Sequence, residues 1–189
     1  MDQHTPVLLH ESVEGLHLKE GDTVVDATLG LGGHSALIAE KIGTEGTLVG
    51  IDADEHARAL AQQRLASTEA TLHFIVGNFR TLDEHLHTLG ITDVDAILFD
   101  LGWNATQLTA GRGFSFRSED PLLMTLSATQ DDATLTAQKI VATWSEEDLA
   151  DIIRTLGEER LAGRIARAIV VRRKTKPIEK AHDLAEVIA

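Results

Sequence analysis

The stretch Asp26-Ala27-Thr28-Leu29-Gly30-Leu31-Gly32-Gly33-His34-Ser35 places a glycine-rich turn between an apolar run and a helical pattern. Thr23–Asp26 predicts a β-strand before the turn, and residues 35–42 predict a helix after it. Such a turn brings a ligand close to backbone amides. In the dinucleotide fingerprint G-x-G-x-x-G, counted from Gly30, the third glycine position holds Ser35. The NAD fingerprint is therefore incomplete.

The alternation of strands and helices continues beyond this turn. Apolar runs predict further strands at residues 47–51, 72–76 and 96–99, and helical spacing predicts helices at residues 55–65 and 82–89. This order is typical of βαβ units with a parallel sheet. We therefore expect an α/β fold with a doubly wound sheet.

The periodicity stops between Gly102 and about Asp132, and helical patterns follow. Ser145 is predicted as the N-cap of a helix that ends at Gly157 and has an apolar face of Leu149, Ile152, Ile153 and Leu156. A second helix is expected over residues 158–174, with Leu161, Ile165, Ala168 and Ile169 facing inward. A third begins near Asp183. The sequence thus predicts a helical region after the sheet.

The composition excludes several classes of protein. The chain of 189 residues has no cysteine, which excludes disulfides, thiolate zinc sites and cysteine nucleophiles. Its nine histidines are scattered, so we predict no metal site. No stretch approaches the roughly 18 to 20 apolar residues of a membrane span, and the N-terminal residues lack the order of a signal peptide. We expect a cytoplasmic protein with no membrane contact.

The charges are unevenly distributed along the chain. A net charge of -13 argues against nonspecific nucleic-acid binding, because phosphate contacts need a positive surface. Nine of the 17 Lys and Arg residues nevertheless lie between Arg154 and Lys180, where only three Glu residues oppose them. Two interpretations stay open for this segment: a solvated helix face, or a face that contacts phosphates.

Acidic residues stand at the ends of three predicted strands. Asp26, Asp52 and Asp100 are expected to meet at one crevice, because ligands bind beyond the carboxyl ends of parallel strands. Asp52, about 20 residues after the turn, suits ribose hydroxyls, although it could instead cap a helix. Phe79 could stack on adenine or pack in the core. Carboxylates favour the sulfonium cation S-adenosylmethionine over an anionic dinucleotide.

Motifs along nearly the whole chain resemble, in the same order, those of the bacterial RsmH (MraW) family. They are His4-Thr5-Pro6-Val7-Leu8-Leu9 with Glu11, the glycine turn, Ile51-Asp52-Ala53-Asp54, Leu98-Phe99-Asp100-Leu101-Gly102, Arg112-Gly113-Phe114-Ser115-Phe116, Gly157-Glu158-Glu159-Arg160, and the stretches from Arg164 to Val170 and from Asp183 to Ile188. The resemblance implies a Rossmann-like class I methyltransferase that uses S-adenosylmethionine to methylate the exocyclic amine of a cytidine in small-subunit ribosomal RNA.

The resemblance also implies roles for individual residues. The cofactor contacts that it implies are Gly32, Gly33, His34, Asp52, Phe79, Asp100 and Gln107. By position, the catalytic candidates are Asp100, the Asn104 side chain or the backbone carbonyls between them, as acceptors for a hydrogen bond from the target amine. Residues 1–115 would form the S-adenosylmethionine-binding domain, and residues 116–189 an incomplete helical substrate-recognition region. The expected partners are small-subunit ribosomal RNA and, through an uncovered sheet edge, a second copy of the chain in a homodimer.

The sequence departs from the family pattern near the target site. The family pattern Val-Ser-Ser-Pro is here Trp103-Asn104-Ala105-Thr106, and Leu123 and Thr125 replace a family acid and arginine. The family's Phe-His-Ser-Leu-Glu-Asp-Arg motif is absent, so we expect either a fragment or a shortened relative. Two alternatives to an active methyltransferase stay open: a catalytically weak or silent relative that binds cofactor or RNA, and an NAD-dependent oxidoreductase.

Overall fold

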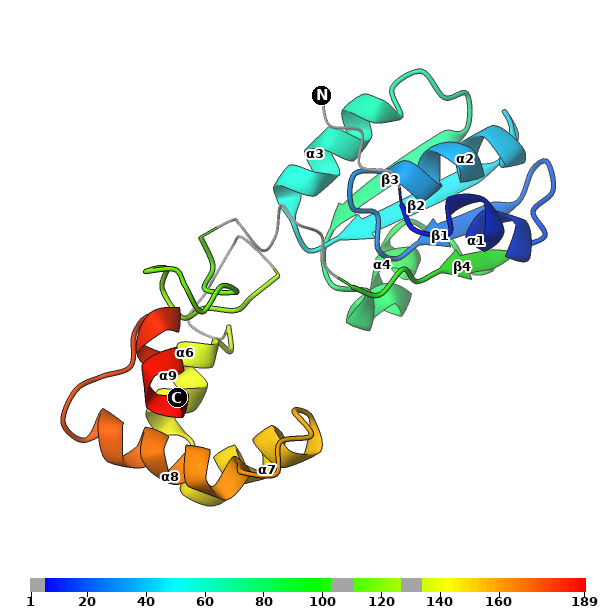
Figure 1. The fold of residues 1–189 in the computed structure, drawn as a ribbon. Helices are drawn as coiled ribbons and strands as arrows, with labels where there is room; N and C mark the ends of the chain where they lie inside the picture. Colours follow the sequence, from blue (N-terminus) through cyan, green and yellow to red (C-terminus); the bar gives the residue numbers. More distant parts are fainter. Residues whose placement is uncertain (1–5, 103–110, 127–133) are drawn as a thin grey trace. The chain divides into compact units, whose positions relative to one another are not determined.

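The structure, a computed structural model, describes residues 6–102, 111–126 and 134–189. These residues form two compact units (Figure 1). The described part of the first unit is residues 6–102, and that of the second is residues 111–126 and 134–189. The described part of the first unit ends at Gly102, and the predicted boundary after residue 115 falls inside the second unit.

Four parallel strands form the sheet of the first unit. They are β1 (Thr23–Asp26), β2 (Thr47–Asp52), β3 (Thr71–Val76) and β4 (Ala96–Leu98), in the order β3-β2-β1-β4. Val24 of β1 is in register with Leu48 of β2 on one side and with Ala96 of β4 on the other. The four predicted strands are confirmed: β1 has the predicted bounds, and each of the other three differs by one residue at one end. Because all strands are parallel, their carboxyl ends meet at one edge of the sheet.

Helices cover both faces of this sheet. The first unit contains α1 (Leu9–Gly15), α2 (Gly33–Ile42), α3 (Glu55–Arg64), a short 3-10 helix (Phe79–Thr81) and α4 (Leu82–Thr88). One face packs against α1, α2 and α3, and the other packs against α4 and the loop after it (Figure 1). The expected doubly wound, Rossmann-like α/β sheet is thereby confirmed. The sequence did not predict α1.

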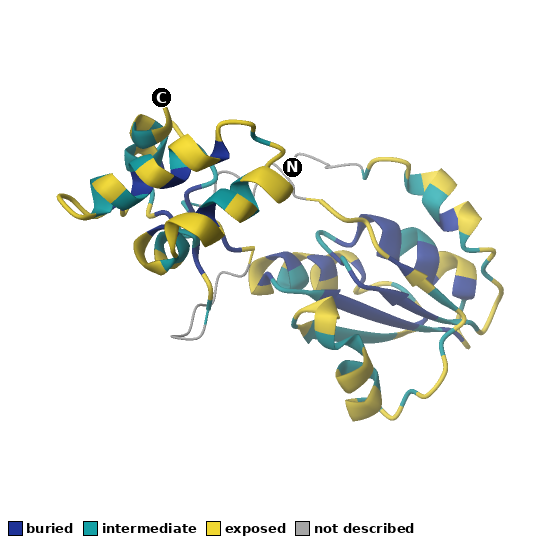
Figure 2. Cartoon of the chain, turned by 90° about the horizontal axis from the view of Figure 1, so that it is seen from below, coloured by how far each residue is buried: buried dark blue, intermediate teal, exposed yellow. Residues whose placement is uncertain are grey.

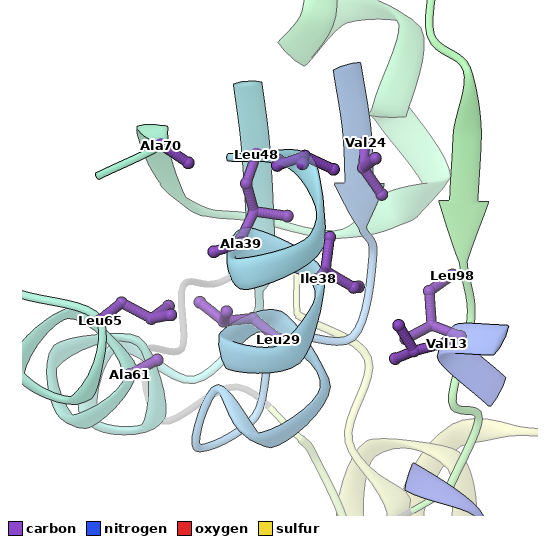
Figure 3. Close-up of a cluster of buried hydrophobic side chains, with 11 residues drawn as sticks. Val13, Val24, Leu29, Ile38, Ala39, Leu48, Ala61, Leu65, Ala70 and Leu98 are labelled. Atoms are coloured by element: carbon purple, nitrogen blue, oxygen red, sulfur yellow. The ribbon is translucent and has the colours of Figure 1, made fainter. Parts of the chain in front are cut away.

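The alternation of side chains along β1 and β2 builds two apolar layers. Val24 and Leu48 point to the layer that also contains Val13 of α1 and Ile38 of α2 (Figure 3). Val25 and the residues that share its face point to α4. Adjacent residues of a strand face opposite sides of the sheet, so β1 and β2 are buried on both faces (Figure 2).

Helices make up the core of the second unit. They are α6 (Ala137–Thr143), α7 (Glu146–Thr155), α8 (Ala162–Arg173) and α9 (Ala181–Ile188), packed around Leu122, Val141, Leu149, Ala166, Ile169, Ile178 and Ala181. The Ser145 hydroxyl accepts a hydrogen bond from the Asp148 amide at 3.0 Å, which confirms the predicted N-cap. The sequence did not predict α6.

The predictions for α7 and α8 are wrong in two details, the burial of two leucines and the residue at which α8 begins. Leu156 and Leu161 are 84% and 52% exposed, because they lie at the ends of α7 and α8 and beyond the contacts of the core. The helix predicted from Glu158 begins at Ala162, since Glu158 adopts a φ of 51°, a left-handed conformation that breaks a helix. The turn between α7 and α8 is therefore longer than the sequence indicates.

None of the helices within residues 6–102, 111–126 and 134–189 combines the length and the apolar character that crossing a bilayer would require.

Candidate functional site

The glycine turn packs closely against residues of the first unit that are distant in the sequence. Gly30 and Gly32 adopt φ of 51° and 73°, the left-handed region that favours glycine. At Gly32, the N-cap of α2, a Cβ would approach the Cβ of Ala61 to 3.1 Å. At Gly33, a Cβ would clash with the ring of Pro6. Helix α2 begins directly after the turn, and the first N–H groups of a helix have no hydrogen-bond partner within that helix.

Asp52 lies at the end of β2 and fixes the turn. Its Oδ2 accepts a hydrogen bond from the Gly30 amide at 2.8 Å, and its Oδ1 accepts one from the Asp54 amide at 2.8 Å. The N-cap of α3 is Asp54, whose side chain accepts from the His56 and Ala57 amides, so the interpretation of Asp52 as a helix cap is wrong. Burial raises the pKa of the Asp52 carboxyl above its ordinary value of 3.8, against the hydrogen bonds that lower it.

Asp26 lies beneath the turn at the end of β1 and is 1% exposed. Its carboxylate accepts hydrogen bonds from the Ser35 hydroxyl at 2.7 Å and from the Thr28 amide at 3.2 Å. Burial raises the pKa of the Asp26 carboxyl above 3.8, although both hydrogen bonds oppose the shift. Ser35, which stands where the dinucleotide fingerprint has glycine, therefore serves to bind this buried acid.

Asp100 follows β4 and meets the turn from the other side of β1. Its amide donates a hydrogen bond to the Thr28 hydroxyl oxygen at 2.7 Å. The Nδ1 of His34 lies 3.8 Å from Oδ2 of Asp100, and the side chains of these residues are 6% and 54% exposed. The Nε2 of His34 is buried and has no hydrogen-bond partner in the described structure. The structure thus brings Gly32, Gly33, His34, Asp52 and Asp100 together around one turn.

The charges of this site are one-sided. Among the described residues, Asp26, Asp52 and Asp100 form no ion pair with Lys or Arg, and His34 is the basic side chain beside Asp100. Burial raises the pKa of the Asp26 and Asp52 carboxyls, against their hydrogen bonds and, at Asp26, against the nearby His34. A positively charged ligand would be attracted to this end of the sheet, and a pyrophosphate would be repelled.

Phe79 follows β3 and contacts Phe99, which follows β4. Their rings meet edge to face, with centroids 5.5 Å apart and an interplanar angle of 83°. Phe79 is 40% exposed and Phe99 is 45% exposed. The interpretation of Phe79 as a core residue is therefore wrong, and the ring is accessible to a ligand. The sequence analysis did not identify Phe99 as a site residue, although its position directly before Asp100 indicates that it lies at the same end of the sheet.

Two of the predicted site residues, Asn104 and Gln107, lie outside the described residues. The role of Thr28 was also not predicted, because a threonine in a turn carries no signal of its own in one sequence. The described residues contain no group of three or more His, Cys, Asp or Glu side chains that could hold a metal ion.

The basic segment of the second unit divides into structural and unpaired cations. Arg173 donates hydrogen bonds to the carbonyls of Val141 and Trp144, both at 2.8 Å, and so caps the end of α6. Lys176 pairs with Asp183 and Lys180 with Glu119. Within residues 111–126 and 134–189, the side chains without an ion pair or hydrogen bond include Arg154, Arg160, Arg164, Arg172 and Lys174.

Two curated relatives match this chain along nearly its whole length, and a solved structure matches about half of it. Ribosomal RNA small subunit methyltransferase H of Brevibacillus brevis is 42% identical over 98% of this chain and 58% of its own length. The protein of the same name from Caldicellulosiruptor bescii is 45% identical over 100% of this chain and 61% of its own length. A solved rRNA methylase from Streptococcus thermophilus is 27% identical, with a TM-score of 0.43 over 56% of this chain and 61% of that one.

The chain thus spans about three fifths of the length of the curated relatives that it matches. The model of one family, the MraW methylase family, matches residues 1–189. Together with the relatives that are 42% and 45% identical, this match shows that the chain belongs to the MraW methylase family.

Proposed function

We propose that the first unit binds S-adenosylmethionine and that the chain is part of a methyltransferase for the exocyclic amine of a cytidine in small-subunit ribosomal RNA. The observation that carries the proposal is the set of carboxylates at the ends of β1, β2 and β4, which no described Lys or Arg neutralises. A sulfonium cation complements this set, whereas the pyrophosphate of NAD does not. The names of the relatives support small-subunit ribosomal RNA as the substrate class.

The described residues fit this cofactor. Each oxygen of Asp52 accepts one backbone N–H, which leaves lone pairs for the two ribose hydroxyls. Phe79 is 40% exposed and would stack on adenine. Gly32 and Gly33 contribute through their backbone, and so does His34, because its ring is buried. Asp100 and Gln107 complete the proposed set of contacts.

The chain's own residues would position and polarise the target amine. S-adenosylmethionine, when bound, supplies an electrophilic methyl group on a positively charged sulfur. The exocyclic amine of cytidine is a weak nucleophile because its lone pair is delocalised into the ring. Asp100, with a carboxylate that is 54% exposed, would accept a hydrogen bond from the amine and favour a tetrahedral nitrogen. Asn104 would be a second acceptor, and alignment of both reactants supplies much of the remaining acceleration.

Residues 116–189, which lie mostly in the second unit, would form a helical substrate-recognition region that contacts the RNA. Several of its cations have no acidic partner, among them Arg160, Arg164 and Lys174. Lys and Arg residues without internal partners are available to phosphates. A ribosomal substrate also places the protein in the cytoplasm.

We further propose a homodimer that forms at β4. Of the described strands, only β1 pairs with β4, and Ile97 in the middle of β4 is 36% exposed. An unpaired edge with apolar side chains promotes strand pairing between copies. Light scattering should detect a dimer that Ile97→Lys dissociates, and a monomer at high concentration would contradict it.

The experiment for the reaction is a labelling assay. The chain is incubated with S-adenosylmethionine labelled on the methyl group and with small ribosomal subunits that lack the modification, and the RNA is digested to nucleosides. Label in cytidine supports a methyltransferase. Cofactor binding without label supports the silent relative, and label in another nucleoside contradicts the proposed target.

A further inference from the structure

Thr28 connects three parts of the candidate site. It follows β1 by two residues and lies half-buried at the start of the glycine turn. Its amide donates to the buried carboxylate of Asp26 at 3.2 Å, and its hydroxyl oxygen accepts the amide of Asp100 at 2.7 Å. One side chain therefore links the ends of β1 and β4, which are far apart in the sequence.

The Thr28 hydroxyl forms its hydrogen bond just beyond the backbone hydrogen bonds that join β1 and β4. The last backbone hydrogen bond between these strands runs from the Ala27 amide to the Leu98 carbonyl at 2.9 Å. Beyond Leu98 the chain leaves β4, and the Asp100 amide bonds to the Thr28 side chain instead of to a strand. This contact fixes the backbone from which the Asp100 carboxylate projects.

The Asp100 carboxylate has few side-chain contacts among the described residues. The carboxylate of Asp100 is 54% exposed, and its side-chain contact among the described residues is His34 Nδ1 at 3.8 Å, longer than a hydrogen bond. No other described side chain holds it. The hydrogen bond of its own amide to Thr28 is therefore the main restraint on its position.

We propose that Thr28 is a positioning residue, whose hydroxyl holds Asp100 in place for the ligand and the target amine. The proposal rests on the proposed function for the role of Asp100. A neutral hydrogen bond of this kind contributes modestly to an equilibrium, so its loss should weaken ligand binding about 3- to 10-fold. A ligand contact of Thr28 itself is not required.

The test compares Thr28→Val, which keeps the shape and removes the hydroxyl, with Thr28→Ser, which keeps the hydroxyl. Calorimetry measures the affinity for S-adenosylhomocysteine, and nuclear magnetic resonance measures hydrogen exchange of the Asp100 amide. Thr28→Val should weaken binding about 3- to 10-fold and speed exchange. Thr28→Ser should restore both. If the valine variant does not fold, Thr28→Ala removes the same hydroxyl.

A double variant separates positioning from a general structural role. In an Asp100→Ala background no carboxylate remains to be positioned, so Thr28→Val should cause no further loss of affinity. An equal loss in both backgrounds, or unchanged exchange of the Asp100 amide in Thr28→Val, would overturn the proposal. The exchange measurement needs no ligand, so a parent chain that fails to bind the cofactor refutes the proposed function and leaves this test intact.

Discussion

The substitution Asp52→Ala probes the proposed ribose contact directly. The carboxylate of Asp52 uses one lone pair on each oxygen for the Gly30 and Asp54 amides, both at 2.8 Å. A carboxylate has about four acceptor sites, so about two remain for the ribose hydroxyls. Hydrogen bonds to a charged group contribute more than neutral ones, and their loss should cost about 1 to 3 kcal/mol. The dissociation constant should therefore rise about 5- to 150-fold.

The assay is calorimetric titration of S-adenosylhomocysteine into parent and variant. A matched control is Asp93→Ala, which removes an exposed carboxylate of the same unit that contacts the Thr92 hydroxyl at 2.9 Å. The Gly30 and Asp54 amides lose an acceptor in Asp52→Ala, so thermal unfolding must first show that the variant is folded at the titration temperature. Equal affinity of the folded variant and the parent would show that Asp52 does not contact the ribose.

The same contact predicts a pH dependence. Burial raises the pKa of Asp52 above 3.8, and the ribose hydroxyls require the ionised carboxylate as acceptor. As the pH falls through the raised pKa, the free protein takes up a proton that binding must displace, so affinity should fall. Asp52→Ala should remove this part of the pH dependence, and an identical profile in the variant would count against it.

Three further predictions concern other parts of the chain. Because the pKa of Asp26 is raised in the folded protein, the parent should lose stability as the pH rises above 3.8 and Asp26 ionises. Asp26→Asn cannot ionise there, so urea unfolding should show its stability rising relative to that of the parent over this pH range. A difference in stability that does not change with pH would contradict this. Phe79→Leu should weaken S-adenosylhomocysteine binding by about 1 to 3 kcal/mol through lost stacking, while Phe79→Tyr should not, and equal losses in both variants would argue against stacking. The pair Arg164→Gln and Lys174→Gln should weaken RNA binding and lessen its salt dependence without changing cofactor affinity, and an unchanged salt slope would identify a solvated face.

The sheet could be predicted because its strands are buried on both faces. In Thr23–Asp26 and Thr47–Asp52, a threonine is followed by valine, leucine, isoleucine or glycine up to an acidic end, and this pattern has few other interpretations. The acidic ends then located the candidate site, since parallel strands present their carboxyl ends together. Asp52 and Asp100 accordingly lie at the glycine turn, as expected from the sequence.

The remaining details depend on contacts between distant residues. The hydrogen bond between Thr28 and Asp100 joins residues 72 positions apart, and no local pattern specifies it. The burial of Ser35 against Asp26 is equally invisible in a single sequence. Leu156 has helical spacing with Leu149, yet it is exposed because α7 ends before its side chain reaches a neighbour. Periodicity predicts a face but not how far the partner of that face extends.

Calorimetric titration of the chain with S-adenosylmethionine and, separately, with NAD measures which of the two cofactors the first unit binds. The unpaired carboxylates at the ends of β1, β2 and β4 predict saturable binding of S-adenosylmethionine with one site per chain and much weaker binding of NAD. Affinity for NAD equal to or greater than that for S-adenosylmethionine, or no binding of S-adenosylmethionine by the folded chain, would contradict the account.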